Sequence, residues 1–286
     1  MSELRAKAIF FPHPKKHNWV LGLLLKLTAA NAPHVIVLLM SARLPRPLAE
    51  LVRELALSAF PMGGVYIEAG AHDGVSHSNT LSLSKNQWSG ILIEPSPISF
   101  EKLKMNRPND LLANVALVGS DDIAMIRGTF GQGSLMSSAD ADLMSRTPRV
   151  RTSFIGRMIN LIPQRLLSFH VATIEVPATT LDKLLDENQI QSVDIFILDV
   201  EGFEMEALRG FGFNPKPRVV IIETRYKFAA EINNLMLSKG YILCGNFSNF
   251  SKEISSTFTE DHQDFVWVSK DDFNTIQAVL DVELYL

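Results

Sequence analysis

Short apolar segments of this chain repeatedly end in an acidic residue, and one of them leads into a glycine-containing turn. The β-branched and aromatic residues 65–67 favour a strand, and they are followed by Glu68, Gly70 and Gly74. Glycines directly after a strand let the backbone turn tightly and approach a ligand closely. The pattern E-x-G-x-x-x-G therefore indicates a cofactor-binding loop, and the alternative is a strand turn that binds nothing.

A second acid, Glu94, closes the apolar run 91–93 at a spacing that suits a ribose ligand. It lies 20 residues after Gly74, and an acid about 20 residues beyond a glycine motif binds ribose in dinucleotide folds. His72 stands where G-x-G-x-x-G would have its second glycine, which counts against a nicotinamide cofactor and favours methyl transfer over hydride transfer. The alternative for Glu94 is a solvated strand end or a helix cap.

Two further carboxylates, Asp199 and Glu201, lie where the apolar segment 193–200 ends. One of them is suited to accept a proton from a hydroxyl, and both together are suited to hold a divalent cation that acidifies it. His262, just before the last expected strand, is a third candidate proton acceptor. The alternative is a strand end followed by acids that stabilise the N-terminus of a helix.

Alternating strand and helix patterns indicate the elements that position these residues. This alternation favours a doubly wound α/β sheet, in which ligands bind beyond the carboxyl ends of the strands. The expected strands cover residues 65–67, 91–93, 111–118 (with Asn114 inside), 193–200, 217–224, 241–246 and 265–268. The expected helices cover residues 78–85, 100–106, 179–185, 204–208 and 229–239.

The chain divides into an N-terminal helical region, residues 1–60, and an α/β domain, residues 61–286. Leucines and a valine at near-helical spacing in residues 46–60 predict a helix with one buried face. Residues 120–170 read as a locally basic insertion in the domain. Insertions of this length often shape a substrate region, and the alternative is a solvated variable loop.

The composition indicates which classes of binding partner and which cellular compartment to expect. Hydrophobic residues make up 47% and charged residues 20% of the 286, which is typical of a globular protein. A net charge of -4 argues against a nucleic-acid partner. Cys244 is the single cysteine, which excludes an intramolecular disulfide and suits a reducing compartment, so we expect a cytoplasmic protein. No apolar run approaches the ~20 residues of a transmembrane helix, and the oligomeric state is not indicated.

Taken together, these motifs resemble the FkbM family of S-adenosylmethionine-dependent methyltransferases over about residues 65–268. The order and the spacing of the pieces agree with the family pattern. The family commonly has Asp- or Asn-containing variants of the glycine loop where this chain has His72. The matching pieces are residues 68–74 (EAGAHDG), 78–80 (SNT), 88–95 (WSGILIEP), 180–182 (TLD), 199–204 (DVEGFE) with Leu208 and Gly210, Ile222-Glu223, and His262 before Asp264-Phe265.

The resemblance implies a class I methyltransferase fold, which is Rossmann-like. Its seven-stranded sheet is mostly parallel and has an antiparallel last strand. It also implies that the glycine loop and Glu94 bind S-adenosylmethionine. The residues that we expect to contact the cofactor are Glu68, Gly70, Ala71, His72, Asp73, Gly74, Ser78, Asn79, Glu94, Pro95 and Asn114.

We therefore expect an O-methyltransferase that acts on a hydroxyl of a sugar, a glycan or a natural-product small molecule. Asp199, Glu201 and His262 are its expected catalytic residues. Participation of a divalent metal is left open, because the sequence does not show which acids converge. The alternatives are a nicotinamide-dependent oxidoreductase and a non-catalytic scaffold that binds a cofactor.

Overall fold

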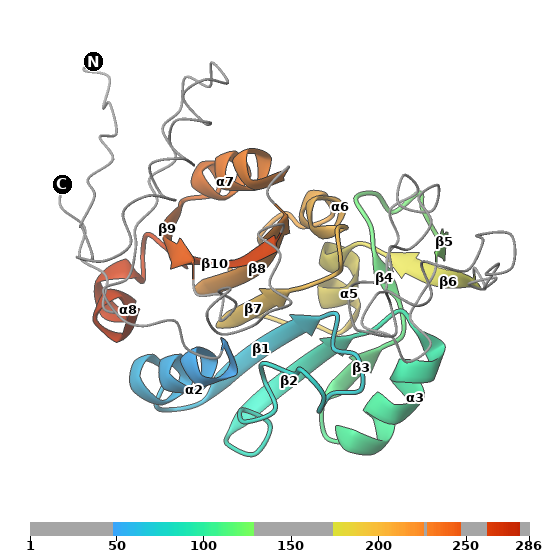
Figure 1. Ribbon diagram of the computed structural model, residues 1–286, viewed down its shortest axis with the longest axis horizontal. Helices are drawn as coiled ribbons and strands as arrows, with labels where there is room; N and C mark the ends of the chain where they lie inside the picture. The colour runs from blue at the N-terminus through green and yellow to red at the C-terminus, as the bar shows by residue number, and fades with distance from the viewer. Residues whose placement is uncertain (1–47, 129–173, 226–227, 247–261, 281–286) are drawn as a thin grey trace, which may run out of the picture.

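A seven-stranded sheet forms the centre of the computed structural model, which describes residues 48–128, 174–225, 228–246 and 262–280 (Figure 1). The last strand in the chain is antiparallel to both of its neighbours, and the other strand pairs are parallel. The expected mostly parallel sheet with an antiparallel last strand is thus confirmed. In spatial order the strands are β3 (Leu111–Ala113), β2 (Trp88–Ile93), β1 (Gly64–Ala69), β7 (Ile195–Leu198), β8 (Val219–Arg225), β10 (His262–Ser269) and β9 (Tyr241–Asn246).

Helices cover both faces of this sheet (Figure 1). One face packs against α5 (Leu181–Glu187), α6 (Glu204–Arg209) and α7 (Ala229–Ser238). The other face packs against α2 (Leu48–Ala59), α3 (Pro97–Asn106) and α8 (Phe273–Leu280). All four residues of β7 are buried, which explains why the central strand reads as a continuous apolar run.

The helix α2 is the described part of the expected N-terminal helical region. Its residues at positions 48, 51, 52, 55 and 56 are buried and form the face that packs on the sheet. Residues 1–47 of that region, and residues 129–170 of the expected insertion, lie outside the described part of the chain. Among the described residues, none of the helices has the length and apolar character needed to span a membrane.

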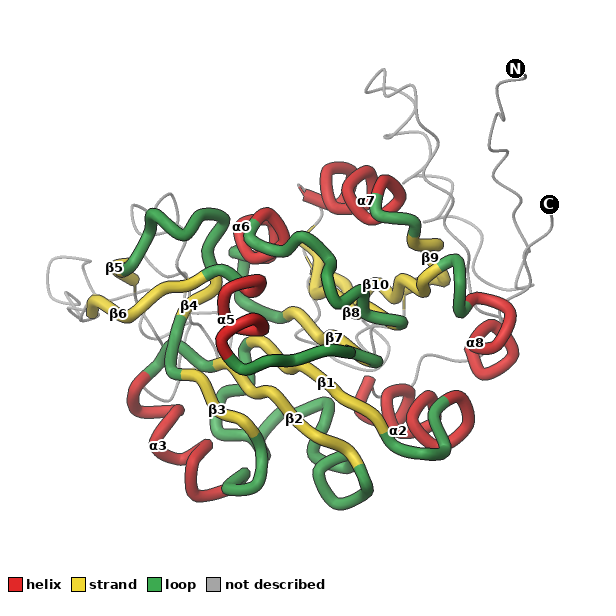
Figure 2. The backbone as a smooth tube through the Cα atoms, turned by 180° about the vertical axis from the view of Figure 1, so that it is seen from behind, coloured by secondary structure: helices red, strands yellow, loops and turns green. Residues whose placement is uncertain are grey.

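A second, three-stranded sheet lies beyond β3, at the side of the molecule away from α8 (Figure 2). It contains β4 (Ala116–Leu117), β6 (Ile174–Thr179) and β5 (Met125–Gly128), in that order. The expected single strand over residues 111–118 is therefore wrong, because β3 and β4 belong to different sheets. The break falls at Asn114, whose side-chain amide donates to the carbonyl oxygens of Glu94 at 2.7 Å and Pro95 at 3.1 Å.

The expected helix over residues 78–85 is also wrong, since this segment forms a succession of turns. Backbone hydrogen bonds such as Leu83 N to Thr80 O, 2.8 Å, close single turns of four residues instead of forming a continuous helical ladder. The cause lies in the preceding strand. The buried Glu68 carboxylate accepts hydrogen bonds from the Ser78 hydroxyl, the Asn79 amide and the Thr80 hydroxyl, so the chain wraps around this side chain.

The reactivity of the single cysteine toward a thiol reagent measures how well the core excludes solvent. Cys244 in β9 is buried, and burial raises the pKa of its thiol to about 12. Since the thiolate is the reactive form, we expect a thiol reagent at mildly alkaline pH to leave the native protein unlabelled. Denaturant should release one reactive thiol for each chain. Rapid labelling without denaturant, followed by absorbance, would contradict the packing of β9.

Candidate functional site

Four carboxylates and a glycine lie in one row across five neighbouring strands, where the parallel strands end. Ile93, Ala69, Leu198 and Ile222 share one register position in the sheet, at the last or a late residue of their strands. The next residues are Glu94, Gly70, Asp199 and Glu223, and Asp264 of β10 pairs directly with Glu223. The topology thus places the acids predicted separately at one edge of the sheet, where open α/β folds bind ligands.

Gly70 brings the first loop against the exit of the central strand. Its φ is +90°, a conformation that favours glycine, and an added Cβ would lie 1.8 Å from the Asp199 carbonyl oxygen. The amides of Gly70 and Ala71 both donate to the Ile93 carbonyl, at 2.9 and 3.1 Å. The glycine loop is therefore fixed between the ends of β2 and β7.

Glu94 is buried beside this loop and holds it through hydrogen bonds. Its carboxylate accepts from the backbone amide of His72 at 2.9 Å and from that of Ser96, just after Pro95, at 2.8 Å. Burial raises the pKa of Glu94, and these two amides offset part of the increase. Glu94 and the backbone of His72, which were each predicted to contact the cofactor, are thus in direct contact with one another.

Asp73 and Gly74 continue the loop as a local turn. The Asp73 carboxylate accepts from the amides of Val75 at 3.0 Å and Ser76 at 2.6 Å. Burial alone would raise the pKa of Asp73, but these donors outweigh it and lower the pKa. His72 has a φ of +50°, and its Nδ1 lies 3.7 Å from Asp73 Oδ1. The loop is therefore held by short-range contacts as well as by Glu94.

Glu68 lies beneath the loop instead of at its open side. It is 3% exposed, and burial raises its pKa, although the hydrogen bonds from Thr80, Asn79 and Ser78 work in the opposite direction. Of the predicted cofactor residues, Glu68, Ser78 and Asn79 therefore bind one another. They determine the path of the loop from within the protein.

Arg107, at the C-terminal end of α3, is a part of this scaffold that was not predicted from the sequence. Its buried guanidinium donates hydrogen bonds to the Asp110 carboxylate at 2.8 Å, the Gly74 carbonyl at 3.0 Å and the Tyr66 hydroxyl at 2.5 Å. Longer contacts reach the hydroxyls of Ser78 and Thr80. The sequence has an arginine at the end of a helix and an acid three residues later. Such pairs are mostly exposed on the surface, so this pattern does not indicate a buried network.

On the other side of Gly70, three carboxylates converge. One oxygen from each of Asp199, Glu201 and Glu223 lies within 4.8 Å of the other two. Burial and the neighbouring carboxylates raise the pKa of Asp199 well above its ordinary range and that of Glu223 to about 8. The hydrogen bond with Asp199 offsets part of this increase for Glu223. Within the described residues, the buried Asp199 Oδ1 has no hydrogen-bond partner.

The structure places the remaining predicted residues at the same edge, with different surroundings. His262 begins β10 and pairs with Arg225 in the sheet, two residues before Asp264; its side chain lies outside what the structure describes. Asn114 contacts the backbone of residues 94 and 95 through its amide. Glu223 and Asp264 were not among the predicted catalytic residues, although both follow or precede apolar strand residues.

Comparison with known families decides which class of protein this site belongs to. A model of the methyltransferase FkbM domain matches residues 68–243, more than half of the chain. The chain belongs to the FkbM methyltransferase family. The glycine loop, Glu94, the Asp199 segment and Glu223 all fall inside the matched range. The resemblance inferred from the motifs is thus confirmed, and this protein is an S-adenosylmethionine-dependent methyltransferase.

The solved structures to which the chain is similar are distant from it in sequence. A TehB-like methyltransferase from Corynebacterium glutamicum is 13% identical, with 88% of this chain and 96% of that chain covered and a TM-score of 0.37. An O-methyltransferase from Bacillus cereus in complex with S-adenosylhomocysteine is 11% identical, with 90% and 94% covered and a TM-score of 0.38. No curated protein matches the chain. The family match is therefore the evidence for the activity, and the topology of the seven-stranded sheet is the evidence for the fold class.

The residues of this FkbM methyltransferase fit its cofactor. A carboxylate has about four acceptor positions, and amides occupy two of those on Glu94, so two remain for a ligand. The backbone at Gly70 leaves no room for a side chain, which keeps the loop close to the strand ends. Both features suit a nucleoside ligand at the edge of the sheet.

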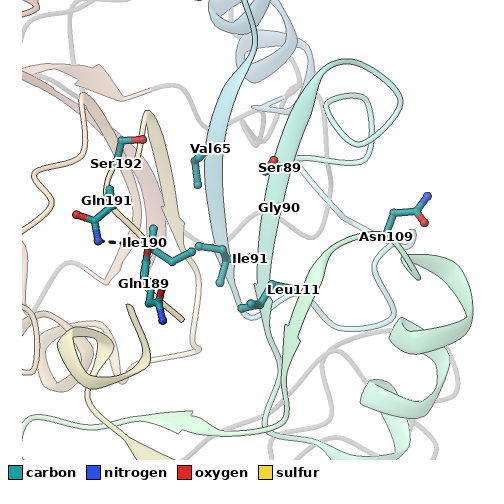
Figure 3. Close-up of a pocket in the computed structure, with 10 residues that line it drawn as sticks. All are labelled: Val65, Ser89, Gly90, Ile91, Asn109, Leu111, Gln189, Ile190, Gln191 and Ser192. Atoms are coloured by element: carbon teal, nitrogen blue, oxygen red, sulfur yellow. Dashed lines mark hydrogen bonds between the residues drawn. The ribbon is translucent and has the colours of Figure 1, made fainter. Parts of the chain in front are cut away.

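A separate cavity of about 440 Å³ lies at the amino ends of β1, β2 and β3 (Figure 3). Ligands of open α/β sheets bind at the opposite, carboxyl edge. This cavity is therefore not the candidate methyl-transfer site. Its lining combines apolar residues of the sheet with uncharged polar side chains: Val65, Ser89, Gly90, Ile91, Asn109, Leu111, Gln189, Ile190, Gln191 and Ser192.

Proposed function

We propose that this methyltransferase acts on a hydroxyl of a sugar, a glycan or a natural-product small molecule. The observation that carries the proposal is the acidic cluster of Asp199, Glu201 and Glu223 directly beside the glycine loop. An alcohol oxygen must lose its proton when it is methylated, so a proton acceptor next to the cofactor loop suits this chemistry. The family match supports methyl transfer, and the cluster supports oxygen as the acceptor atom.

The glycine loop and Glu94 have the cofactor-binding role in this proposal. Glu94 binds the ribose hydroxyls through its two remaining acceptor positions, and the backbone of residues 70–74 contacts the amino-acid end. When bound, S-adenosylmethionine supplies an electrophilic methyl group on a positively charged sulfur. Glu68 and Asn114 contribute to cofactor binding indirectly. The Glu68 side chain holds the loop, and the Asn114 side chain holds the end of β2.

The acidic cluster orients the acceptor hydroxyl and takes its proton. Asp199 is the best candidate, because its Oδ1 is buried without a hydrogen-bond partner among the described residues. Glu201 and Glu223 tune its proton affinity through their charges. Positioning of the hydroxyl supplies much of the remaining rate enhancement. His262 remains a candidate for orienting the acceptor from the start of β10.

Two measurements test the proposal. Calorimetric titration with S-adenosylhomocysteine should show binding to the folded protein, and no heat from a folded sample would contradict the cofactor assignment. A panel of sugars, glycans and small-molecule alcohols should then yield an O-methylated product by mass spectrometry. Methylation of nitrogen or carbon acceptors alone would exclude the hydroxyl assignment. Repeating the assay with EDTA distinguishes proton transfer by the carboxylates alone from a reaction that needs a divalent cation bound by them.

The other functions considered predict different results. A nicotinamide oxidoreductase would bind the reduced dinucleotide, which we expect to give no fluorescence change here, as the family match supports methyl transfer. A scaffold would bind S-adenosylhomocysteine and methylate nothing in the panel. We also propose a cytoplasmic location, which the single buried cysteine supports.

Replacing Glu94 tests its cofactor role directly. We expect Glu94→Ala to weaken S-adenosylhomocysteine binding by about 1.5–3 kcal/mol, the scale of hydrogen bonds to a charged group. Titration calorimetry measures this change. Glu101→Ala, on the exposed side of α3, is the matched control and should bind normally. Equal affinity of the Glu94 variant and the wild type would remove Glu94 from the site.

A further inference from the structure

Glu204 belongs to the same D-V-E-G-F-E segment as Asp199 and Glu201, but the proposed chemistry does not use it. It is the first residue of α6 and is 1% exposed. Its Oε1 accepts hydrogen bonds from the Gly202 amide at 2.9 Å and the Val200 amide at 3.3 Å. A buried carboxylate thus lies against the backbone on either side of Glu201.

The residue between these amides has an unfavourable backbone conformation. Glu201 has a φ of +54°, and Gly202 follows with a φ of +104°. For a residue with a side chain, the left-handed region is sterically costly and persists where the surroundings fix it. Amides that converge in such a turn form a concave site for an anion. In this protein, the carboxylate of Glu204 fills that site from within the same segment.

An ordinary helix cap does not explain this arrangement. A capping side chain accepts from amides inside the first turn of its helix, whereas Glu204 reaches back to amides that precede α6. The residue at the cap position, Phe203, makes no side-chain capping bond. The hydrogen bonds of Glu204 therefore stabilise the loop that carries Glu201 and not the helix.

We propose that Glu204 is a positioning residue, which holds Glu201 in its left-handed conformation and so keeps the Glu201 carboxylate within 4.8 Å of those of Asp199 and Glu223. This inference rests on the proposed function of the acidic cluster. Glu204 acts through the backbone of residues 200–202, so its acceptor oxygen matters more than its charge, which is the smallest of the causes that raise the pKa of Asp199. A glutamine retains such an oxygen, and a leucine of similar size does not.

Crystal structures and kinetics of two variants test the proposal. In Glu204→Leu we expect Glu201 to leave the left-handed region and its carboxylate to move away from Asp199. Turnover should fall about 10- to 100-fold, the effect of a displacement near 1 Å, with S-adenosylhomocysteine affinity unchanged. Glu204→Gln should restore both the conformation and most of the turnover. Glu206→Leu, on the same helix but in an exposed pair with Arg209, is the control.

Several outcomes would overturn the proposal. In one, Glu204→Gln loses as much turnover as Glu204→Leu, which would make the charge itself essential. In another, Glu201 keeps its conformation in the leucine variant, or cofactor affinity falls in parallel with turnover. If the wild type binds no S-adenosylhomocysteine, the proposed function fails, but the conformation of Glu201 in the variant crystals still tests the positioning role.

Discussion

Asp199→Asn should lower turnover by about 10²- to 10⁴-fold, the usual contribution of a general base. Asp199 lies in the centre of the acidic row, next to Gly70 on one side and hydrogen-bonded to Glu223 on the other. The amide has nearly the same shape, but it cannot take up a proton. Since the cofactor loop keeps its contacts with Glu94, the affinity for S-adenosylhomocysteine should stay close to that of the wild type. Steady-state kinetics and calorimetry measure the two effects separately.

Two comparisons make this prediction specific. Asp186→Asn removes an exposed carboxylate from α5 and should leave turnover unchanged. The double variant Asp199→Asn/Glu223→Gln should lose little more than Asp199→Asn alone, because residues that act as a unit are not additive. Parallel losses of turnover and of cofactor affinity in Asp199→Asn would assign this residue to binding instead.

Arg107→Met should lower the free energy of unfolding by about 3–5 kcal/mol, the usual cost of breaking a buried ion pair by removing one partner. The side chains of Arg107 and Asp110 are 1% and 6% exposed. Without the guanidinium, the Asp110 carboxylate stays buried, and it keeps only the hydrogen bond from the Tyr66 hydroxyl among the described contacts. The carbonyl of Gly74 also loses its donor. Urea unfolding followed by circular dichroism measures the change.

An exposed arginine provides the matched control. Arg127→Met breaks a surface pair with Glu175 in which the side chains are 66% and 55% exposed, and such pairs contribute about 0–1 kcal/mol. The double variant Arg107→Met/Asp110→Leu should recover part of the lost stability, since it removes the uncompensated charge. A loss below about 1 kcal/mol in Arg107→Met would show that the network is not a stabilising unit.

The sheet was predictable because its strands carry local signals. Apolar runs such as 91–93 and 195–198 end in acids, and Gly70 follows β1 where the turn requires a positive φ. Those signals depend on side chains near in sequence, which single-chain patterns record well. The acids at the ends of the parallel strands could therefore be placed at one edge of the sheet from the order of residues alone.

The errors have a common cause, which is hydrogen bonding between distant side chains and backbone. Glu68 binds residues 78–80 and prevents a helix there, and Asn114 divides an apolar run by binding the end of β2. Neither effect changes the periodicity of the sequence. The hydrogen bonds of Arg107 with distant residues likewise produce no recognisable pattern in the sequence. The pairing of Glu223 with Asp264 depends on an antiparallel register between strands far apart in the chain.

Because the backbone at Gly70 lies against the backbone at Asp199, the glycine loop and the carboxyl end of β7 form one structural unit. No side chain fits at position 70, since its Cβ would lie 1.8 Å from the Asp199 oxygen. A mutation that moves either segment must displace the other. Laboratory evolution toward new acceptors should therefore fix its beneficial substitutions around this junction and leave the junction itself unchanged.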